Sequence, residues 1–418
     1  MAAVLQRRKI LPIGDFAFSG QALCHPRAVA LDPAAFAVLS RLVRRALAVE
    51  EGAPEGPVDL AGVAPADLLE AVRRHRVGDL LLPHAVTLGL PGEVERELRA
   101  AHAYARPRLV VQALETVRAW RALTDAGIDA LVIKGLPLSV VTTGRTDARG
   151  AGDVDLFVGP ASVVEAHRVL NEQGWRVPET GPVEPGLWAW RHLLRWGNAL
   201  TYEGTAADAD LHWRLEVTPG THPGFATFWS RRVEVDLGVG RVPTLAPGDA
   251  LRHLAAHREG ATWLRTLVDL RRLARDPRVL DGPLPALALG YLAVARETVG
   301  LPDTVPADVA RRLDAVDPRL VERARARQLA DVRRDFGGGA GSLRALADNR
   351  ALSTGRADLA YAAMALVLPV HTALPVRART AWTGVPAALL RRARALLLGV
   401  RARLRPGAPC AEPPGRGA

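Results

Sequence analysis

The stretch ARGAGDVDLFVGP, residues 148–160, sets two aspartates into a run that is otherwise typical of a buried strand. In a strand, residues i and i+2 point to the same face, so Asp153 and Asp155 are expected to lie side by side. At about 5 Å and an effective dielectric constant of about 20, two carboxylates repel by roughly 3 kcal/mol. The pair therefore predicts a nearby cation. The alternative is a solvated strand end, where the repulsion falls to about 1 kcal/mol and no metal is needed.

The segments on either side of this stretch predict an α+β fold with a small mixed β-sheet. The dipeptide Lys134-Gly135 ends one strand and begins a helix, because Pro137 is well placed in a first helical turn. Expected helices in this region cover 108–127 and 160–174, and expected strands cover 128–134, 152–158, 198–204 and 207–217. The last strand alternates apolar residues with polar ones and carries Asp210. Trp188, Trp190 and Trp196 are expected in a loop, where packing is favoured over stacking on a nucleobase.

Helical patterns flank this α+β core on both sides. The expected organisation is an N-terminal, mainly helical region over 1–107, the core over 108–246, a C-terminal helical region over 247–403 and a disordered tail over 404–418. On the C-terminal side, His253 and His257 stand at i and i+4 and could bind a metal, but packing of the helix is favoured because no third ligand is evident.

Composition restricts the classes of partner. The chain has 418 residues and a net charge of +11, yet only two of its basic residues are lysines, Lys9 and Lys134. Abundant arginine and alanine are typical of GC-rich coding DNA, so the positive net charge is only weak support for a nucleic-acid partner, and such a partner is unlikely. Cys24 and Cys410 have no disulfide-framework or zinc spacing, which favours a cytoplasmic protein. A basic amphipathic stretch at 387–405 allows weak membrane association, although a helix packed on the core is favoured.

Four motifs together resemble a bacterial family of uncharacterised nucleotidyltransferases within the DNA polymerase β-like nucleotidyltransferase superfamily. They are LVIKG at 131–135, RGAGDVDLFV at 149–158, ADLHWRL at 209–215 and the longer run at 241–275. The resemblance implies a short mixed sheet on which Asp153 and Asp155 form a metal-binding pair and Asp210 supplies the third carboxylate. These three residues would be the catalytic set, with Mg2+ or Mn2+ as the cofactor.

The implied reaction moves a nucleoside monophosphate from an NTP donor to a hydroxyl of a small molecule, peptide or natural-product intermediate. Carboxylate oxygens suit Mg2+, and an in-line displacement at phosphorus is assisted by metals that stabilise the attacking and leaving oxygens. Lys134 and Gly135 stand where the wider superfamily has Gly-Ser or Gly-Gly, and Arg149 is a second candidate phosphate ligand. The departure at Lys134-Gly135 keeps an alternative open, in which a non-catalytic nucleotide-binding or regulatory protein retains the fold.

Overall fold

A computed structural model describes residues 30–330 except 55, 151, 179–184, 217–219 and 257–259, together with a few isolated helical residues between 360 and 397. His257 and the expected tail at 404–418 lie outside the described residues, as does most of the basic stretch at 387–405. In the described part of the chain, no helix combines the length and apolarity needed to cross a membrane.

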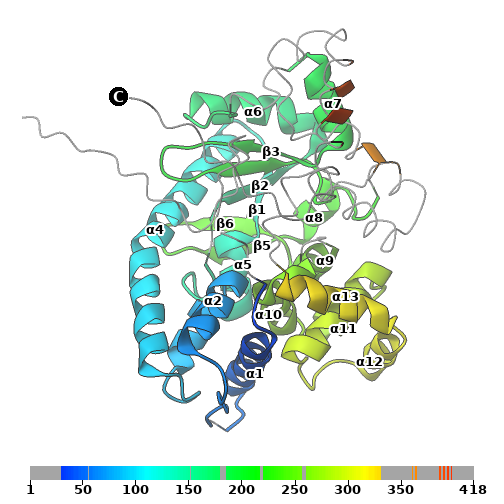
Figure 1. Ribbon diagram of the computed structural model, residues 1–418. Coiled ribbons are helices and arrows are strands. Elements are labelled where there is room, and N and C mark those ends of the chain that lie inside the picture. The colour runs from blue at the N-terminus through cyan, green and yellow to red at the C-terminus, as the bar shows by residue number, and fades with distance from the viewer. Residues whose placement is uncertain are drawn as a thin grey trace, which may run out of the picture.

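The centre of the fold is a mixed four-stranded sheet, which confirms the predicted α+β class (Figure 1). Its strands, in spatial order, are β1 (Ala130–Ile133), β2 (Val154–Val158), β4 (Ala209–His212) and β3 (Ala199–Tyr202). Strand β2 pairs antiparallel with β1 and parallel with β4, and β3 pairs antiparallel with β4. A separate antiparallel hairpin is formed by β5 (Val233–Asp236) and β6 (Arg241–Thr244).

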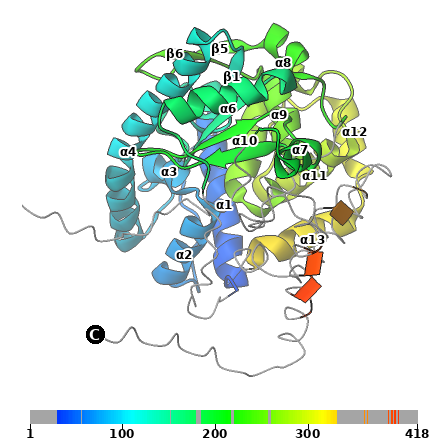
Figure 2. The ribbon, with the colours of Figure 1, turned by 90° about the horizontal axis from the view of Figure 1, so that it is seen from above.

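The two faces of the sheet belong to two different hydrophobic cores. Val154, Leu156 and Val158 of β2 pack with α4 (Gly92–Asp125), α6 (Val163–Glu172) and α7 (Trp188–Trp196). Seen from above, α6 lies across the sheet on this side (Figure 2). Phe157, on the opposite face of β2, joins the second core with the N- and C-terminal helices. Because side chains alternate between the two faces along a strand, Asp155 lies on the same face as Phe157, toward the second core.

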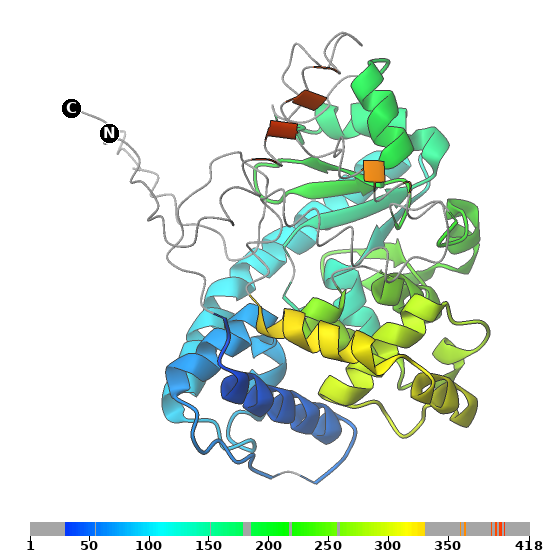
Figure 3. The same ribbon diagram turned by 45° about the vertical axis from the view of Figure 1, so that its right-hand side comes forward.

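N-terminal and C-terminal helices share the second core, so they form one half of the molecule (Figure 3). The N-terminal set is α1 (Pro33–Glu50), α2 (Pro65–His75), α3 (Gly78–Leu81) and the first turns of α4. The C-terminal set is α9 (Pro247–Ala256), α10 (Leu264–Leu273), α11 (Ala286–Val299), α12 (Ala307–Asp314) and α13 (Pro318–Leu329). Glu50 and Glu51 at the end of α1 form ion pairs with arginines of α10, which fixes the two sets together.

Two local expectations meet a different structure. Helix α4 continues through Pro107, so the expected boundary after residue 107 falls inside a helix that joins the helical half to the sheet. The tryptophan stretch expected as a loop is helix α7, and Trp188 and Trp190 are buried. The helix forms because apolar side chains at 190, 193 and 194 gather at helical spacing against the sheet core. Packing, the favoured role of these tryptophans, is confirmed for the two buried ones.

Candidate active site

Parallel pairing of β2 with β4 places Asp155 directly opposite Asp210 in the strand register. Both carboxylates therefore project from the same face of the sheet, toward the helical half. Asp155 is 5% exposed, whereas Asp210 is half-buried. Two acidic side chains at one sheet position require compensation by a cation or by hydrogen-bond donors.

His212 is the histidine of the motif ADLHWRL, to which the sequence assigned no role. It follows Asp210 by two residues on β4, so it shares the same face, and its Nε2 atom lies 3.1 Å from Asp155 Oδ1. Ligand atoms of Asp155, Asp210 and His212 all lie within 4.8 Å of one another. The i+2 spacing from Asp210 was the sequence signal that could have placed His212 on the same face of the strand. Only the pairing of β2 with β4 shows that its imidazole contacts Asp155.

Lys134 supplies a positive charge next to Asp155. It caps α5 (Gly135–Thr143), and its Nζ atom lies 3.5 Å from Asp155 Oδ1. Its backbone has φ 54° and ψ −144°, a conformation that residues other than glycine rarely adopt. Burial would lower the pKa of Lys134, but the carboxylates of Asp155, Asp153 and Asp210 outweigh it and raise the pKa. The lysine is therefore charged, and the strained turn holds it against the carboxylates.

Asp153 and Asp155 carry their charges in different environments. Burial acts to raise the pKa of Asp155, but Lys134 and His212 outweigh burial and hold it well below its usual range. Asp153 lies one residue before β2, and Gln112 of α4 donates a hydrogen bond of 2.7 Å to its backbone carbonyl. Repulsion from Asp155, with burial and then Asp210, raises the pKa of Asp153 to about 7. The repulsion between Asp153 and Asp155 that the sequence predicted therefore appears as the raised pKa of Asp153.

This group of side chains fits a divalent metal. Two carboxylates and one imidazole offer ligand atoms in a single cluster, and Asp153 adds a carboxylate whose charge is poorly compensated without a cation. Asp155 and Asp210 would hold the ion, with Asp153 beside them. The predicted ligands Asp155 and Asp210 thus lie on the two central strands of the sheet, and Asp153 lies one residue before β2, although Asp153 is not one of the three residues whose ligand atoms form the cluster.

Arg149, the second candidate phosphate ligand, is 7% exposed and engaged with a buried partner. Its Nε atom donates to Asp269 Oδ2 of α10 at 2.7 Å. Arg265 of α10, which the sequence analysis did not single out, donates to the backbone carbonyl of Gly150 at 2.8 Å. Burial, and then the nearby Arg149 and Arg76, lower the pKa of Arg265 to about 9. Two guanidinium groups therefore lie beside the loop that leads into Asp153.

Comparison with known proteins agrees with this arrangement. No curated protein matches the chain. A family model described as uncharacterised nucleotidyltransferase matches residues 62–283, a segment that contains both carboxylate strands, Lys134 and α10. Since this match covers more than half of the chain, the protein belongs to that family of uncharacterised nucleotidyltransferases.

Proposed function

We propose that the protein is a metal-dependent nucleotidyltransferase that moves a nucleoside monophosphate from an NTP to a hydroxyl of a small molecule, peptide or natural-product intermediate. The single observation that carries the proposal is the register pairing of Asp155 with Asp210, with His212 and Lys134 converging on Asp155. A buried and a half-buried carboxylate that face a lysine suit a ligand that combines a divalent metal with phosphate groups.

In this reaction the acceptor oxygen attacks the α-phosphorus of the NTP. A new oxygen–phosphorus bond forms, the bond to the bridging β-phosphate oxygen breaks, and pyrophosphate leaves with that electron pair. Mg2+ or Mn2+ bound by Asp155, Asp210 and Asp153 would supply charge stabilisation at the reacting phosphate. Asp210, which is half-buried, would accept the hydroxyl proton if the acceptor binds within hydrogen-bond reach of it.

Donor phosphates would be bound by the turn and the arginines around it. Lys134 contributes an ammonium, and the first turn of α5, starting at Gly135, contributes backbone N–H groups. Arg149 and Arg265 add positive charge next to the loop before β2. These groups are the proposed donor-binding residues.

One observation favours the alternative of a non-catalytic nucleotide-binding protein. Lys134 already compensates Asp155, so the ammonium competes with a metal for the same carboxylate oxygen. Metal-dependent binding and turnover separate the two functions. Calorimetry with each NTP and Mg2+ measures binding. Turnover is measured with an NTP labelled at the α-phosphate and a deproteinised extract of metabolites and peptides as the source of acceptors. Transfer appears as label in an acid-stable product.

For an enzyme, label appears in a product, pyrophosphate is released in equal amount, and both signals are lost in Asp155→Asn. For a binding protein, calorimetry detects a nucleotide but no label is transferred with any NTP. The absence of both nucleotide binding and label transfer, with Mg2+ and with Mn2+, would contradict both functions.

A further inference from the structure

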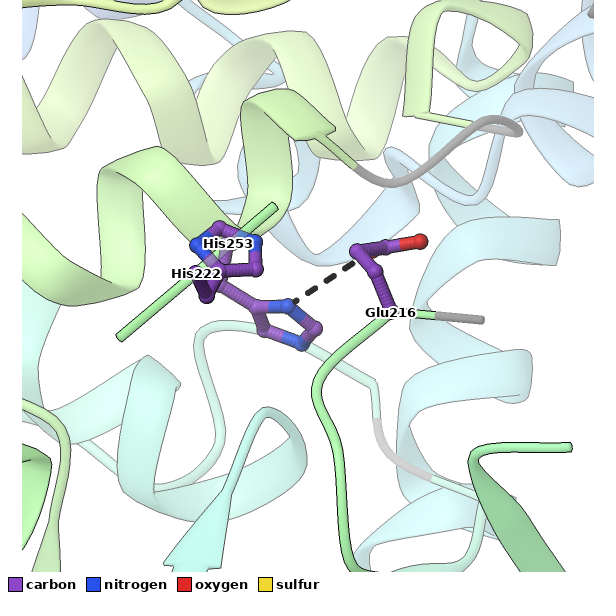
Figure 4. A group of neighbouring side chains, drawn as sticks. All are labelled: Glu216, His222 and His253. Atoms are coloured by element: carbon purple, nitrogen blue, oxygen red, sulfur yellow. Dashed lines mark ion pairs between the residues drawn. The ribbon is translucent and has the colours of Figure 1, made fainter. Parts of the chain in front are cut away.

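A second group of metal-ligand side chains lies in the helical half of the molecule (Figure 4). Glu216 follows β4 by four residues, His222 precedes α8 (Phe225–Arg231), and His253 lies on α9. Their ligand atoms all lie within 4.8 Å of one another. His253 Nδ1 is 3.9 Å from Glu216 Oε1, and the two imidazole rings are 6.0 Å apart at 71°. Three segments therefore converge on one point with two imidazoles and one carboxylate.

The environment of this group suits metal binding. His253 is 1% exposed and the side chain of Glu216 is 11% exposed. The Nε2 atom of His222 is buried, and within the described residues it has no hydrogen-bond partner. Burial, assisted by Arg252, lowers the pKa of His222 to about 4. At neutral pH this imidazole is therefore neutral, which is the form that coordinates metals.

We propose that Glu216, His222 and His253 bind one divalent transition-metal ion of the Zn2+ class, at a site separate from the Asp155–Asp210 pair. Imidazole nitrogen with a single carboxylate is a donor set preferred by Zn2+ over Mg2+. Tetrahedral coordination with bonds of about 2.0 Å places ligand atoms about 3.3 Å apart. The ligand atoms, which all lie within 4.8 Å of one another, would therefore approach by at most roughly 1.5 Å. Glu216 and His222 lie outside regular helices and strands, where such a shift disturbs no backbone ladder.

Two features connect this site to the candidate active site. A small cavity of ≈ 10 Å³ is lined by both Lys134 and His253. Glu216 is also among the carboxylates that oppose burial and raise the pKa of Lys134. A metal bound here would attach the segment after β4, the strand of Asp210 and His212, to α9. Its role would be to position that strand end and Lys134.

The experiment uses the full-length protein, freed of metal by a chelator and then dialysed against micromolar Zn2+ in excess Mg2+. Bound metal is counted by elemental analysis in an Asp155→Asn/Asp210→Asn background, so that the carboxylate pair does not contribute. We expect one Zn2+ per chain in this background, and at least tenfold weaker binding after adding His222→Gln or Glu216→Gln. His84→Gln is the matched control, because it removes another half-buried imidazole from a different part of the chain, and it should leave binding unchanged.

X-ray absorption at the zinc edge of the wild-type protein with one equivalent of Zn2+ provides a readout that needs no variant to fold. Two imidazole ligands and oxygen ligands are expected. An all-oxygen shell, or a Zn2+ stoichiometry that the folded His222→Gln and Glu216→Gln proteins retain, would overturn the proposal. None of these measurements depends on nucleotide turnover, so the result stands apart from the proposed transferase activity.

Discussion

Asp155 of β2 and Asp210 of β4 are direct partners across two parallel strands, and this pairing brings both carboxylates together on one face of the sheet, over its two central strands. Their side chains come from segments more than 50 residues apart in the chain. Lys134 and His212 both contact Oδ1 of Asp155, at 3.5 and 3.1 Å. The two carboxylates therefore differ, since Asp155 is compensated by contacts within the protein and Asp210 remains half-buried.

Asp155→Asn should abolish transfer and also destabilise the fold. Charge repulsion alone would predict neutral or higher stability, but the structure shows that this carboxylate accepts from Lys134 and His212 in a buried setting. Breaking such a pair should cost about 2–4 kcal/mol of unfolding free energy. Loss of a metal ligand should lower turnover by about two decades or more. Denaturant unfolding in chelator and a label-transfer assay measure the two effects.

The stability loss in Asp155→Asn should depend on pH. The pKa of Asp155 is lowered in the folded state, so its stabilising effect is complete above the ordinary aspartate range and disappears as the pH falls through its folded pKa. Asp208→Asn is the matched control, because Asp208 precedes the neighbouring strand β4 and accepts a backbone hydrogen bond from Gly204 outside the cluster. Equal stability of Asp155→Asn and wild type at pH 7 would contradict the assigned role of Lys134.

Asp153→Asn should have the opposite effect on the metal-free protein. The pKa of Asp153 is raised to about 7, so the folded state binds this proton more tightly than the unfolded chain. Stability is therefore lost as the pH rises from about 4 to about 7. Asp153→Asn removes that loss. We expect the free energy of unfolding of this variant to be about 1–3 kcal/mol higher than that of wild type at pH 8, and equal to it near pH 4. Unfolding curves in chelator at the two pH values test this, and a stability difference that does not change with pH would refute the assignment.

Lys134→Ala and Lys134→Gly separate the charge of this residue from its backbone strain. Both variants lose the ammonium, so both should bind the metal–NTP complex more weakly than wild type does. Only glycine relieves a backbone at φ 54°, so Lys134→Gly should be more stable than Lys134→Ala by about 1 kcal/mol. Thermal melts and calorimetry measure the pair. If alanine were as well tolerated as glycine, the turn would not be strained in solution.

Arg149 can be tested for phosphate binding only if its buried partner is removed with it. Arg149→Met alone leaves Asp269 buried without its ion pair and should cost about 3–5 kcal/mol. Arg149→Met/Asp269→Leu replaces the pair by apolar groups and should recover most of that loss. We expect this double variant to bind the metal–NTP complex about tenfold more weakly, about 1.4 kcal/mol. Unchanged affinity in the folded double variant would restrict Arg149 to a structural role.

Local sequence patterns were sufficient for the elements that repeat on a short period. The hydrophobic run at 152–158 and the alternation at 207–217 predicted strands β2 and β4, with Asp155 and Asp210 on them, although β4 ends at His212, five residues before the expected end. The Lys134-Gly135 break predicted a strand–turn–helix unit, and that unit is present as β1 and α5. These predictions succeeded because the side-chain period of a strand and the stop signals of a helix are properties of adjacent residues.

Tertiary structure alone decided which of these elements meet. Strand order β1-β2-β4-β3 brings Lys134, Asp155 and His212 together, and the fold gathers Glu216, His222 and His253 at a second point. It also buries Arg149 against Asp269. Such contacts depend on the free energy of packing segments that are distant in the chain. A pattern read along one segment carries no information about that energy, so the sequence by itself determined the local elements and their polar faces, and packing determined the two clusters.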